Sequence, residues 1–160
     1  MTTKLRSYSA ILCLSFSIAI LGMPGTGAAS GGWSDTPRTD PDIVKAEKAI
    51  KDKNWNQAIE LLNAALARDK QNADIYNFLG YAERNRGNLD AAFKHYERAL
   101  TLNPKHRGAH EYLGEAYLMT GDLAKAEEHL AVLNKLCFFP CEEYRDLKTA
   151  IAGYKQKNAK

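Results

Sequence analysis

The segment "ADIYNFLGYAERNRGNLDAAFKHYERALTLNPKH", residues 73–106, carries the pattern from which the fold can be predicted. Its apolar and small residues recur at spacings of three and four, which is typical of amphipathic helices, and no part alternates with the period of two expected of a strand. Gly87 and Asn88 divide the stretch. Glycine tolerates the left-handed conformation that ends a helix, and asparagine favours the N-cap of the next one. The stretch therefore predicts two helices joined by a tight turn.

The same pattern recurs 34 residues upstream and 34 residues downstream. Small residues in fixed columns let antiparallel helices approach closely, while larger residues fill the space beside them. The period predicts three helix pairs, over residues 39–72, 73–106 and 107–140. The recurring columns are Ala58, Ala92 and Ala126; Asn54, Asn88 and Asp122; Trp55, Leu89 and Leu123; Leu62, Tyr96 and Leu130; Ala65, Ala99 and Leu133; and Ala46, Gly80 and Gly114.

These columns resemble those of the tetratricopeptide repeat (TPR) family over residues 39–140. The third repeat has Phe138 where the family usually has proline, and the first has Lys45 and Ala46 in place of leucine and glycine, as suits a terminal repeat. The resemblance implies an all-α, TPR-type α-solenoid of three helix pairs. The matching positions are Tyr76, Leu79, Gly80, Ala92, Tyr96, Ala99 and Pro104 in the middle repeat, and His110, Leu113, Gly114, Tyr117, Ala126 and Leu130 in the third.

A seventh helix is predicted over residues 141–157. Tyr144, Leu147, Ile151 and Tyr154 fall on one face of it, at spacings of three and four. A stack of repeats needs such a capping helix, because its last apolar face would otherwise be exposed to water. Residues 41–157 are thus expected to form one TPR domain with a C-terminal cap.

The N-terminal segment has the three parts of a secretory signal peptide, predicted over residues 1–29. Lys4 and Arg6 give a basic start, residues 10–21 are apolar and uncharged, and small residues follow. The apolar run is short for a membrane span of roughly 20 residues, so we expect cleavage and no membrane attachment afterwards. Cys13 would be removed with the signal. Residues 30–40 read as a flexible linker, and the mature protein is expected to be periplasmic or secreted.

Composition limits the classes of partner. Without Lys4 and Arg6, 20 of the 22 basic residues remain against 19 acidic residues. A nearly neutral domain of about 130 residues offers no electrostatic reason to bind nucleic acid or anionic lipid. We therefore expect a protein or peptide partner.

Cys137 and Cys141 flank Phe138, Phe139 and Pro140. Pro140 breaks the helix, and the resulting turn can bring the two cysteines within bonding range. Because an exported chain with an even number of cysteines favours pairing, we predict a disulfide, with Phe138 and Phe139 buried beneath the cap. A redox-active dithiol and a copper(I) or zinc site remain alternatives. The ending around the two cysteines also resembles that of some small exported bacterial TPR proteins.

Catalytic chemistry is not indicated. His106 and His110 have a spacing that can hold a metal ion, but without a clear third ligand we interpret them as surface histidines. No nucleophile has a nearby histidine and carboxylate, and no glycine-rich phosphate loop is present. We expect no enzyme activity, no cofactor and no metal.

The TPR resemblance implies a concave surface made by the first helix of each pair. Residues at spacings of three and four would face it, and their polar groups suit a peptide segment. The leading hypothesis is an exported adaptor for a partner protein; the alternatives are a thiol-based redox or metal-handling factor and a self-associating scaffold. The predicted partner-binding residues are Asn77, Tyr81, Arg84, Glu111, Glu115 and Leu118. The carboxylate clamp of the family's chaperone-binding members is absent, since its positions carry Ile43, Glu47, Phe78, Gly108 and Tyr112.

Overall fold

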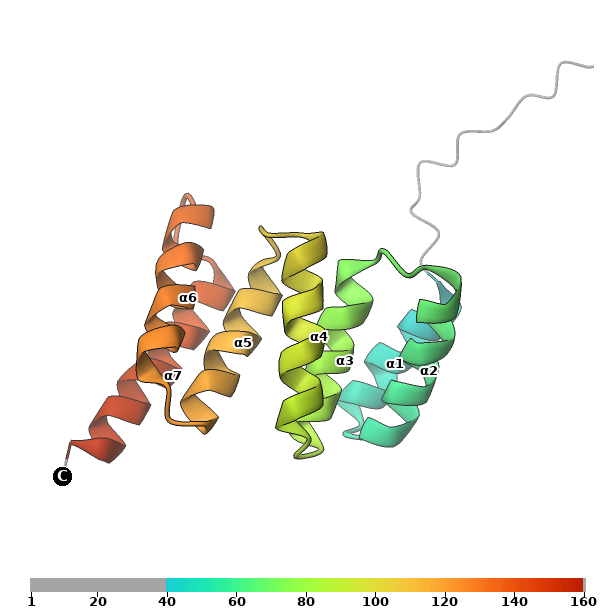
Figure 1. Cartoon of the computed structure of the whole chain (residues 1–160), viewed down its shortest axis with the longest axis horizontal. Coiled ribbons are helices and arrows are strands. Elements are labelled where there is room, and N and C mark those ends of the chain that lie inside the picture. Colours follow the sequence, from blue (N-terminus) through green and yellow to red (C-terminus); the bar gives the residue numbers. More distant parts are fainter. Residues whose placement is uncertain (1–39, 160) are drawn as a thin grey trace, which may run out of the picture. The chain divides into compact units, whose positions relative to one another are not determined.

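The computed structural model describes residues 40–159. Within this range the chain forms seven helices and no strand (Figure 1). They form three pairs followed by a single helix, which confirms the fold class expected from the period. The helices are α1 (Pro41–Lys51), α2 (Trp55–Arg68), α3 (Ala73–Asn85), α4 (Leu89–Leu102), α5 (Arg107–Met119), α6 (Leu123–Leu136) and α7 (Glu142–Asn158).

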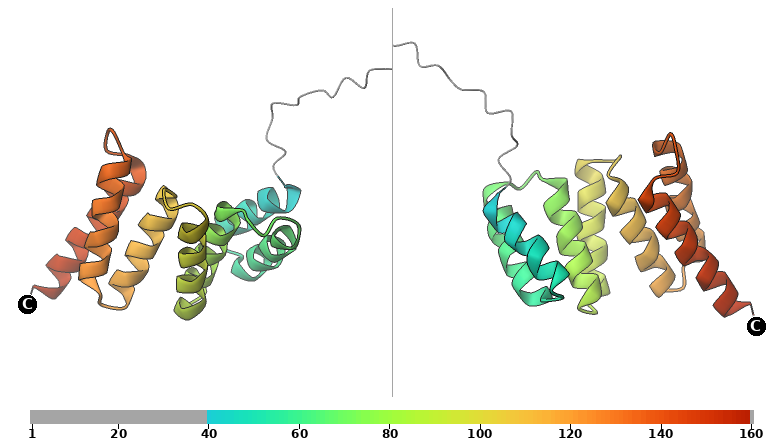
Figure 2. Two further views of the ribbon diagram at one scale, coloured as in Figure 1. Left: turned by 45° about the horizontal axis from the view of Figure 1, so that its top comes forward. Right: turned by 180° about the vertical axis from the view of Figure 1, so that it is seen from behind.

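The pairs stack in chain order, as the two views in Figure 2 show. Helix α1 contacts α3, α3 contacts α5 and α5 contacts α7, whereas α2, α4 and α6 make no contact with one another. The first helices of successive pairs therefore lie closer together than the second helices. The side formed by α1, α3, α5 and α7 is accordingly the inner side of the stack.

The helix starts follow the predicted N-caps. Asn54, Asn88 and Asp122 each accept a hydrogen bond from a backbone N–H two or three residues into the helix. Asp40 caps α1 in the same way, with Pro41 at the first helical position. Each cap satisfies a donor that a helix start would otherwise leave unpaired.

The turn inside each helix pair contains one residue whose backbone is in the left-handed conformation, with a positive φ. Gly87 and Gly121 have φ of 91° and 86°, and Lys53, at the equivalent position of the first pair, has φ of 57°. Glycine adopts this conformation without the steric conflict of a Cβ atom. The first pair thus places a lysine where the other two have glycine.

Two glycines allow helices to pack closely. A Cβ atom on Gly80 would lie 2.5 Å from the ring of Tyr96, and one on Gly114 would lie 2.7 Å from Cδ2 of Leu147. Tyr96 and Leu147 are both fully buried. The glycine column therefore serves two different contacts, one inside a pair and one beneath the capping helix.

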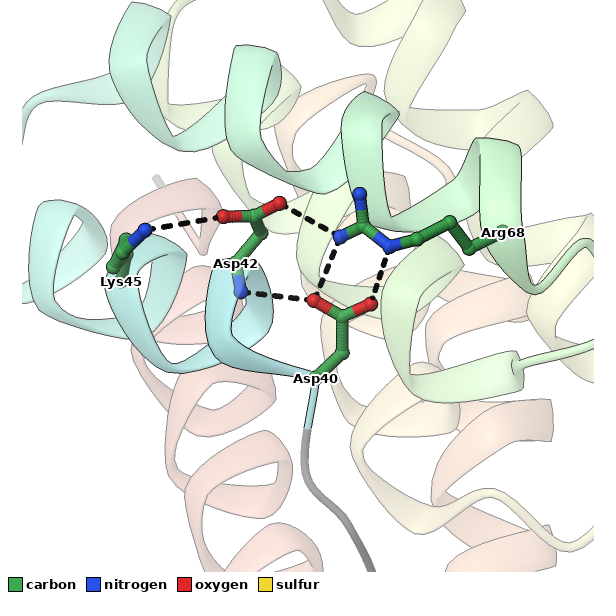
Figure 3. Close-up of polar contacts among 4 residues, drawn as sticks. All are labelled: Asp40, Asp42, Lys45 and Arg68. Atoms are coloured by element: carbon green, nitrogen blue, oxygen red, sulfur yellow. Dashed lines mark hydrogen bonds and ion pairs between the residues drawn. The ribbon is translucent and has the colours of Figure 1, made fainter.

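Arg68, at the end of α2, holds the start of α1 (Figure 3). Its Nε and Nη2 donate to the Asp40 carboxylate at 2.8 and 2.7 Å, and Nη2 also donates to Asp42 at 2.7 Å. These hydrogen bonds keep the pKa of both aspartates below its ordinary value. The contact ties the two ends of the first helix pair together.

Helix α7 caps the stack as expected. Leu147 and Ile151 are buried against Ala126 and Leu133 of α6. The Cys137 and Cys141 sulfurs lie 2.06 Å apart as a disulfide, in agreement with the favoured interpretation of the pair.

The expectation that Phe138 and Phe139 are buried beneath the cap is wrong. Their exposed fractions are 94% and 76%. The apolar space between α6 and α7 is already filled by Leu133, Leu147 and Ile151, so the disulfide-closed loop carries both phenylalanines outward.

None of the helices between Asp40 and Ala159 is long and apolar enough to cross a membrane. The predicted signal peptide, with Cys13, and nearly all of the predicted linker lie outside the described residues.

Candidate partner-binding site

A pocket of about 250 Å³ opens on the inner side, between α3, α5 and α7. Each of these helices contributes residues to the wall, so the site exists only when the cap is in place. The lining residues are Asn77, Gly108, Glu111, Tyr112, Glu142, Glu143 and Asp146.

The pocket is acidic. Glu111 comes from α5, and Glu142, Glu143 and Asp146 come from the first turns of α7. Glu111 is only 8% exposed. Burial, followed by the negative charges of Glu115, Asp146 and Glu143, raises the pKa of Glu111 to about 8. The pocket therefore holds one carboxyl that is mostly protonated at neutral pH.

Asn77 is the residue of α3 that lines the pocket. It is 5% exposed, and its amide oxygen has no hydrogen-bond partner. A Cβ atom on Gly108 would lie 3.2 Å from Nδ2 of Asn77, so a larger residue at position 108 would crowd the amide. A buried amide without a partner is uncommon in folded proteins, and here it lines a pocket.

A second group of residues links α3 and α5. Arg84 and Glu115 form an ion pair, and the Arg84 guanidinium lies 5.4 and 5.5 Å from the ring centres of Tyr81 and Tyr112. The two tyrosine rings are 4.9 Å apart, and Trp55 meets Tyr81 edge-on at 6.1 Å. These contacts stabilise Arg84 through charge and cation–π interactions, and they give this part of the inner side an aromatic surface.

The predicted partner-binding residues are thus divided among three places. Asn77 and Glu111 line the pocket, whereas Tyr81, Arg84 and Glu115 form the neighbouring aromatic and charged group. Leu118 packs against the buried cluster beneath α7. The carboxylates of α7 were not among the predicted site residues, because a helical pattern identifies a capping helix without indicating which face lies beside α5.

The histidines are not surface residues. His110 is 7% exposed, and its Nδ1 lies 2.8 Å from Nδ1 of His129. His106 is the N-cap of α5, since its Nδ1 accepts from the backbone N–H of Ala109 while Nε2 lies 2.9 Å from Asp74. The interpretation as solvent-exposed histidines is therefore wrong. The two histidines lie four residues apart because His106 caps the start of α5 and His110, one turn later, packs in the interior against His129.

Between Asp40 and Ala159, no group of three or more histidine, cysteine, aspartate or glutamate side chains has an arrangement suited to a metal ion. The acidic pocket has carboxylates on several sides, but they do not converge on one point.

Two tetratricopeptide repeat family models match the chain, over residues 44–106 and 83–151. The human protein O-mannosyl-transferase TMTC3 is 30% identical over 83 residues, 52% of this chain and 9% of that protein. The chain spans less than a tenth of the curated relatives it matches.

Solved structures share the fold at low sequence identity. The Yersinia enterocolitica type III secretion chaperone SycD, in complex with a peptide of the translocator YopD, has a TM-score of 0.61 at 20% identity, over 72% of this chain and 88% of that one. The TPR2B domain of yeast Sti1 in complex with pHsp70 has a TM-score of 0.66 at 14% identity, over 73% of this chain and 95% of that one. With its 34-residue columns, its three stacked helix pairs and these matches, the chain belongs to the tetratricopeptide repeat family.

Proposed function

We propose that this protein is an exported interaction adaptor, which binds a segment of a partner protein along the inner side formed by α3, α5 and α7. The observation that carries the proposal is the pocket at this side, with the buried Asn77 amide in its wall. The core of the repeats uses neither this amide nor the pocket carboxylates. Groups of this kind on a rigid surface are typical of binding sites.

The chemistry of the inner side suits an extended or helical peptide. Tyr81 and Tyr112 offer flat aromatic surface at low conformational cost, and the adjacent carboxylates offer hydrogen-bond acceptors. The structurally similar SycD binds a peptide of YopD, and the TPR2B domain of Sti1 forms a complex with pHsp70. This similarity in fold supports a binding function for this chain rather than a catalytic one.

Export is the second part of the proposal. It rests on the basic start, apolar run and small residues of positions 1–29. N-terminal sequencing of protein recovered from the cell envelope or medium is expected to begin near residues 29–31. Recovery of the intact N-terminus from the cytoplasm would contradict export without affecting the binding proposal.

A photo-crosslinking experiment tests the binding surface. Azidophenylalanine replaces Tyr81, on the inner side, or Tyr76, a matched control on the same helix whose ring packs toward His95 and Arg98 of α4. We expect the Tyr81 position to crosslink one defined partner segment, mapped by mass spectrometry, and the Tyr76 position not to.

The mapped segment is then synthesised and titrated against the purified protein. Saturable binding with one segment per chain supports the proposal. Equal crosslinking from both positions, or no binding of the synthetic segment, would overturn it.

A further inference from the structure

We infer that the pocket between α3, α5 and α7 is a subsite for one basic side chain, lysine or arginine, of the partner segment. This inference rests on the proposed function, because it names what part of the bound segment the pocket recognises. Three independent features of the pocket carry it: its charge, its unpartnered amide and its shape.

The first feature is negative charge that only one basic side chain offsets. Four carboxyl groups, from Glu111, Glu142, Glu143 and Asp146, line one small pocket. Arg107 contacts Glu143 at 3.4 Å, and Arg84 pairs with Glu115 outside the pocket. No ion pair within the described residues involves Glu111, Glu142 or Asp146. Like charges gathered on adjacent helices repel one another, and a cation placed among them removes the repulsion.

The second feature is the Asn77 side chain. It is 95% buried, lines the pocket and leaves its amide oxygen without a partner. An unsatisfied buried acceptor costs free energy, and an N–H donor entering the pocket would satisfy it. Lysine and arginine supply such donors and no acceptor, so both match a wall made of carboxylates and an amide oxygen.

The third feature is the shape of the pocket. A volume of about 250 Å³ accommodates the end of one long side chain. Gly108 has no side chain that would fill the pocket. Tyr112 offers an aromatic surface against which the charged group or the alkyl part of a lysine or arginine side chain can pack. Since the carboxylates do not form a metal site, a side chain that spreads several donors fits better than a bare ion.

The protonation of Glu111 supplies an additional readout. Burial, together with Glu115 on its own helix and Asp146 and Glu143 of α7, raises the pKa of Glu111 to about 8. The facing Arg84 of α3 acts in the opposite direction. A bound cation would favour the ionised carboxylate and so release a proton near neutral pH. Binding is therefore expected to strengthen as pH rises from 7 toward 9, where both basic side chains stay charged.

A display library of unstructured peptides, selected on the purified protein, tests the inference. We expect the selected peptides to share lysine or arginine at one position, and glutamine there to weaken binding at least about tenfold. The pocket variant Glu111→Gln/Asp146→Asn is expected to lose a similar factor. The matched control is Glu60→Gln/Glu97→Gln, which removes two exposed carboxylates from α2 and α4 and should change affinity by less than about twofold.

The outcomes separate the two proposals. Peptides that bind the protein without a required basic position, or that bind the pocket variant with unchanged affinity, overturn the basic-residue subsite and leave the adaptor function standing. A library from which no peptide binds overturns the adaptor function itself. Competition decides between two sources of the cation: stronger displacement of a selected peptide by spermidine than by N-acetyl-arginine amide or N-acetyl-lysine amide would replace the partner side chain with a free polyamine.

The variant is expected to fold, because Asp146→Asn removes a repelling charge and Glu111→Gln replaces a carboxyl that is mostly protonated at neutral pH. Its thermal melting, followed by circular dichroism, should be at or above that of the wild type. Isothermal titration in buffers of different ionisation enthalpy then measures the released proton, which should disappear in Glu111→Gln.

Discussion

The Nδ1 atoms of His110 and His129 lie 2.8 Å apart, which joins α5 to α6 through a pair of imidazoles. His110 Nε2 lies 3.0 Å from the carbonyl oxygen of Pro104 and must donate to it. In a neutral ring, Nδ1 of His110 is then an acceptor, and His129 donates its Nδ1–H to it. Protonation of both rings would place two N–H groups face to face, and burial opposes even the first positive charge.

Acid should therefore destabilise the protein through this pair. Burial lowers the pKa of His110, and burial together with His110 lowers the pKa of His129 to about 4. The unfolded chain, with a histidine pKa near its ordinary 6.5, binds more protons between pH 6.5 and 4, so stability is full above 6.5 and falls as pH drops. We expect a loss of about 1–3 kcal/mol from His129 over this range, measured by urea unfolding.

The variant His129→Gln isolates that contribution, since glutamine does not titrate. Glu111 acts with the opposite sign: its raised pKa favours the folded state at low pH, and this benefit is lost as pH rises toward about 8. The difference between wild type and His129→Gln removes the Glu111 effect. A difference that stays constant from pH 7.5 to 4.5 would contradict the histidine mechanism.

The ion pair of Arg84 and Glu115 should couple two repeats. Arg84→Met is expected to destabilise the protein by about 1–3 kcal/mol, because Glu115 is left without its charged partner. Glu115→Gln should cost less, since it keeps a hydrogen-bond acceptor. Chemical denaturation of both single variants and the double variant gives the coupling energy, and additive effects would show that the pair contributes nothing.

The glycine beneath the cap should not tolerate a methyl group. Gly114→Ala is expected to destabilise the protein by about 1–3 kcal/mol, because its Cβ would lie 2.7 Å from Cδ2 of the buried Leu147. Gly153→Ala on α7 is the matched control, with no atom within 4 Å of the new Cβ, and its better helix propensity should add about 0.5–1 kcal/mol. Thermal melts that rank the two variants in the opposite order would argue against close packing here.

Replacing Lys53 with glycine, the residue at the equivalent turn of the other two repeats, should stabilise the protein. Lys53 has φ of 57°, in the region where Gly87 and Gly121 lie. Lys53→Gly is expected to stabilise the protein by about 0.5–1 kcal/mol, because it removes the left-handed strain of a side chain. Gly87→Ala, with open space around its Cβ but φ of 91°, should destabilise it, and its melting temperature provides the comparison.

The disulfide should contribute modestly to stability. Its loop is short, so Cys137→Ser/Cys141→Ser is expected to cost about 2 kcal/mol. Mass spectrometry of protein from its native compartment should find the chain lighter by two hydrogen atoms than the reduced form. If the double variant keeps its fold and melting temperature but loses a cellular function, the thiol-based redox or metal-handling alternative gains support over the structural role.

The helices and their ends follow from local rules that sequence expresses directly. Asn54, Asn88 and Asp122 were predicted as N-caps, and all three accept the expected backbone hydrogen bonds. Leu147 and Ile151 were predicted on the packing face of the cap, and both are buried. Such features depend on neighbours within a turn or two of helix, or on a repeated contact that the 34-residue period makes visible.

Contacts between residues outside the repeated columns depend on how the helices pack in three dimensions. Glu111 meets Glu143 and Asp146 because α7 lies across α5 at one particular angle and rotation, which depends on how Leu147 fills the space over Gly114. The same packing leaves no room for Phe138 and Phe139, which point into solvent. The stack of helix pairs and its cap can be predicted from the amino-acid pattern, because that pattern is local and repetitive. The acidic pocket and the buried histidine pair arise from side-chain packing between helices, which no spacing along the chain specifies.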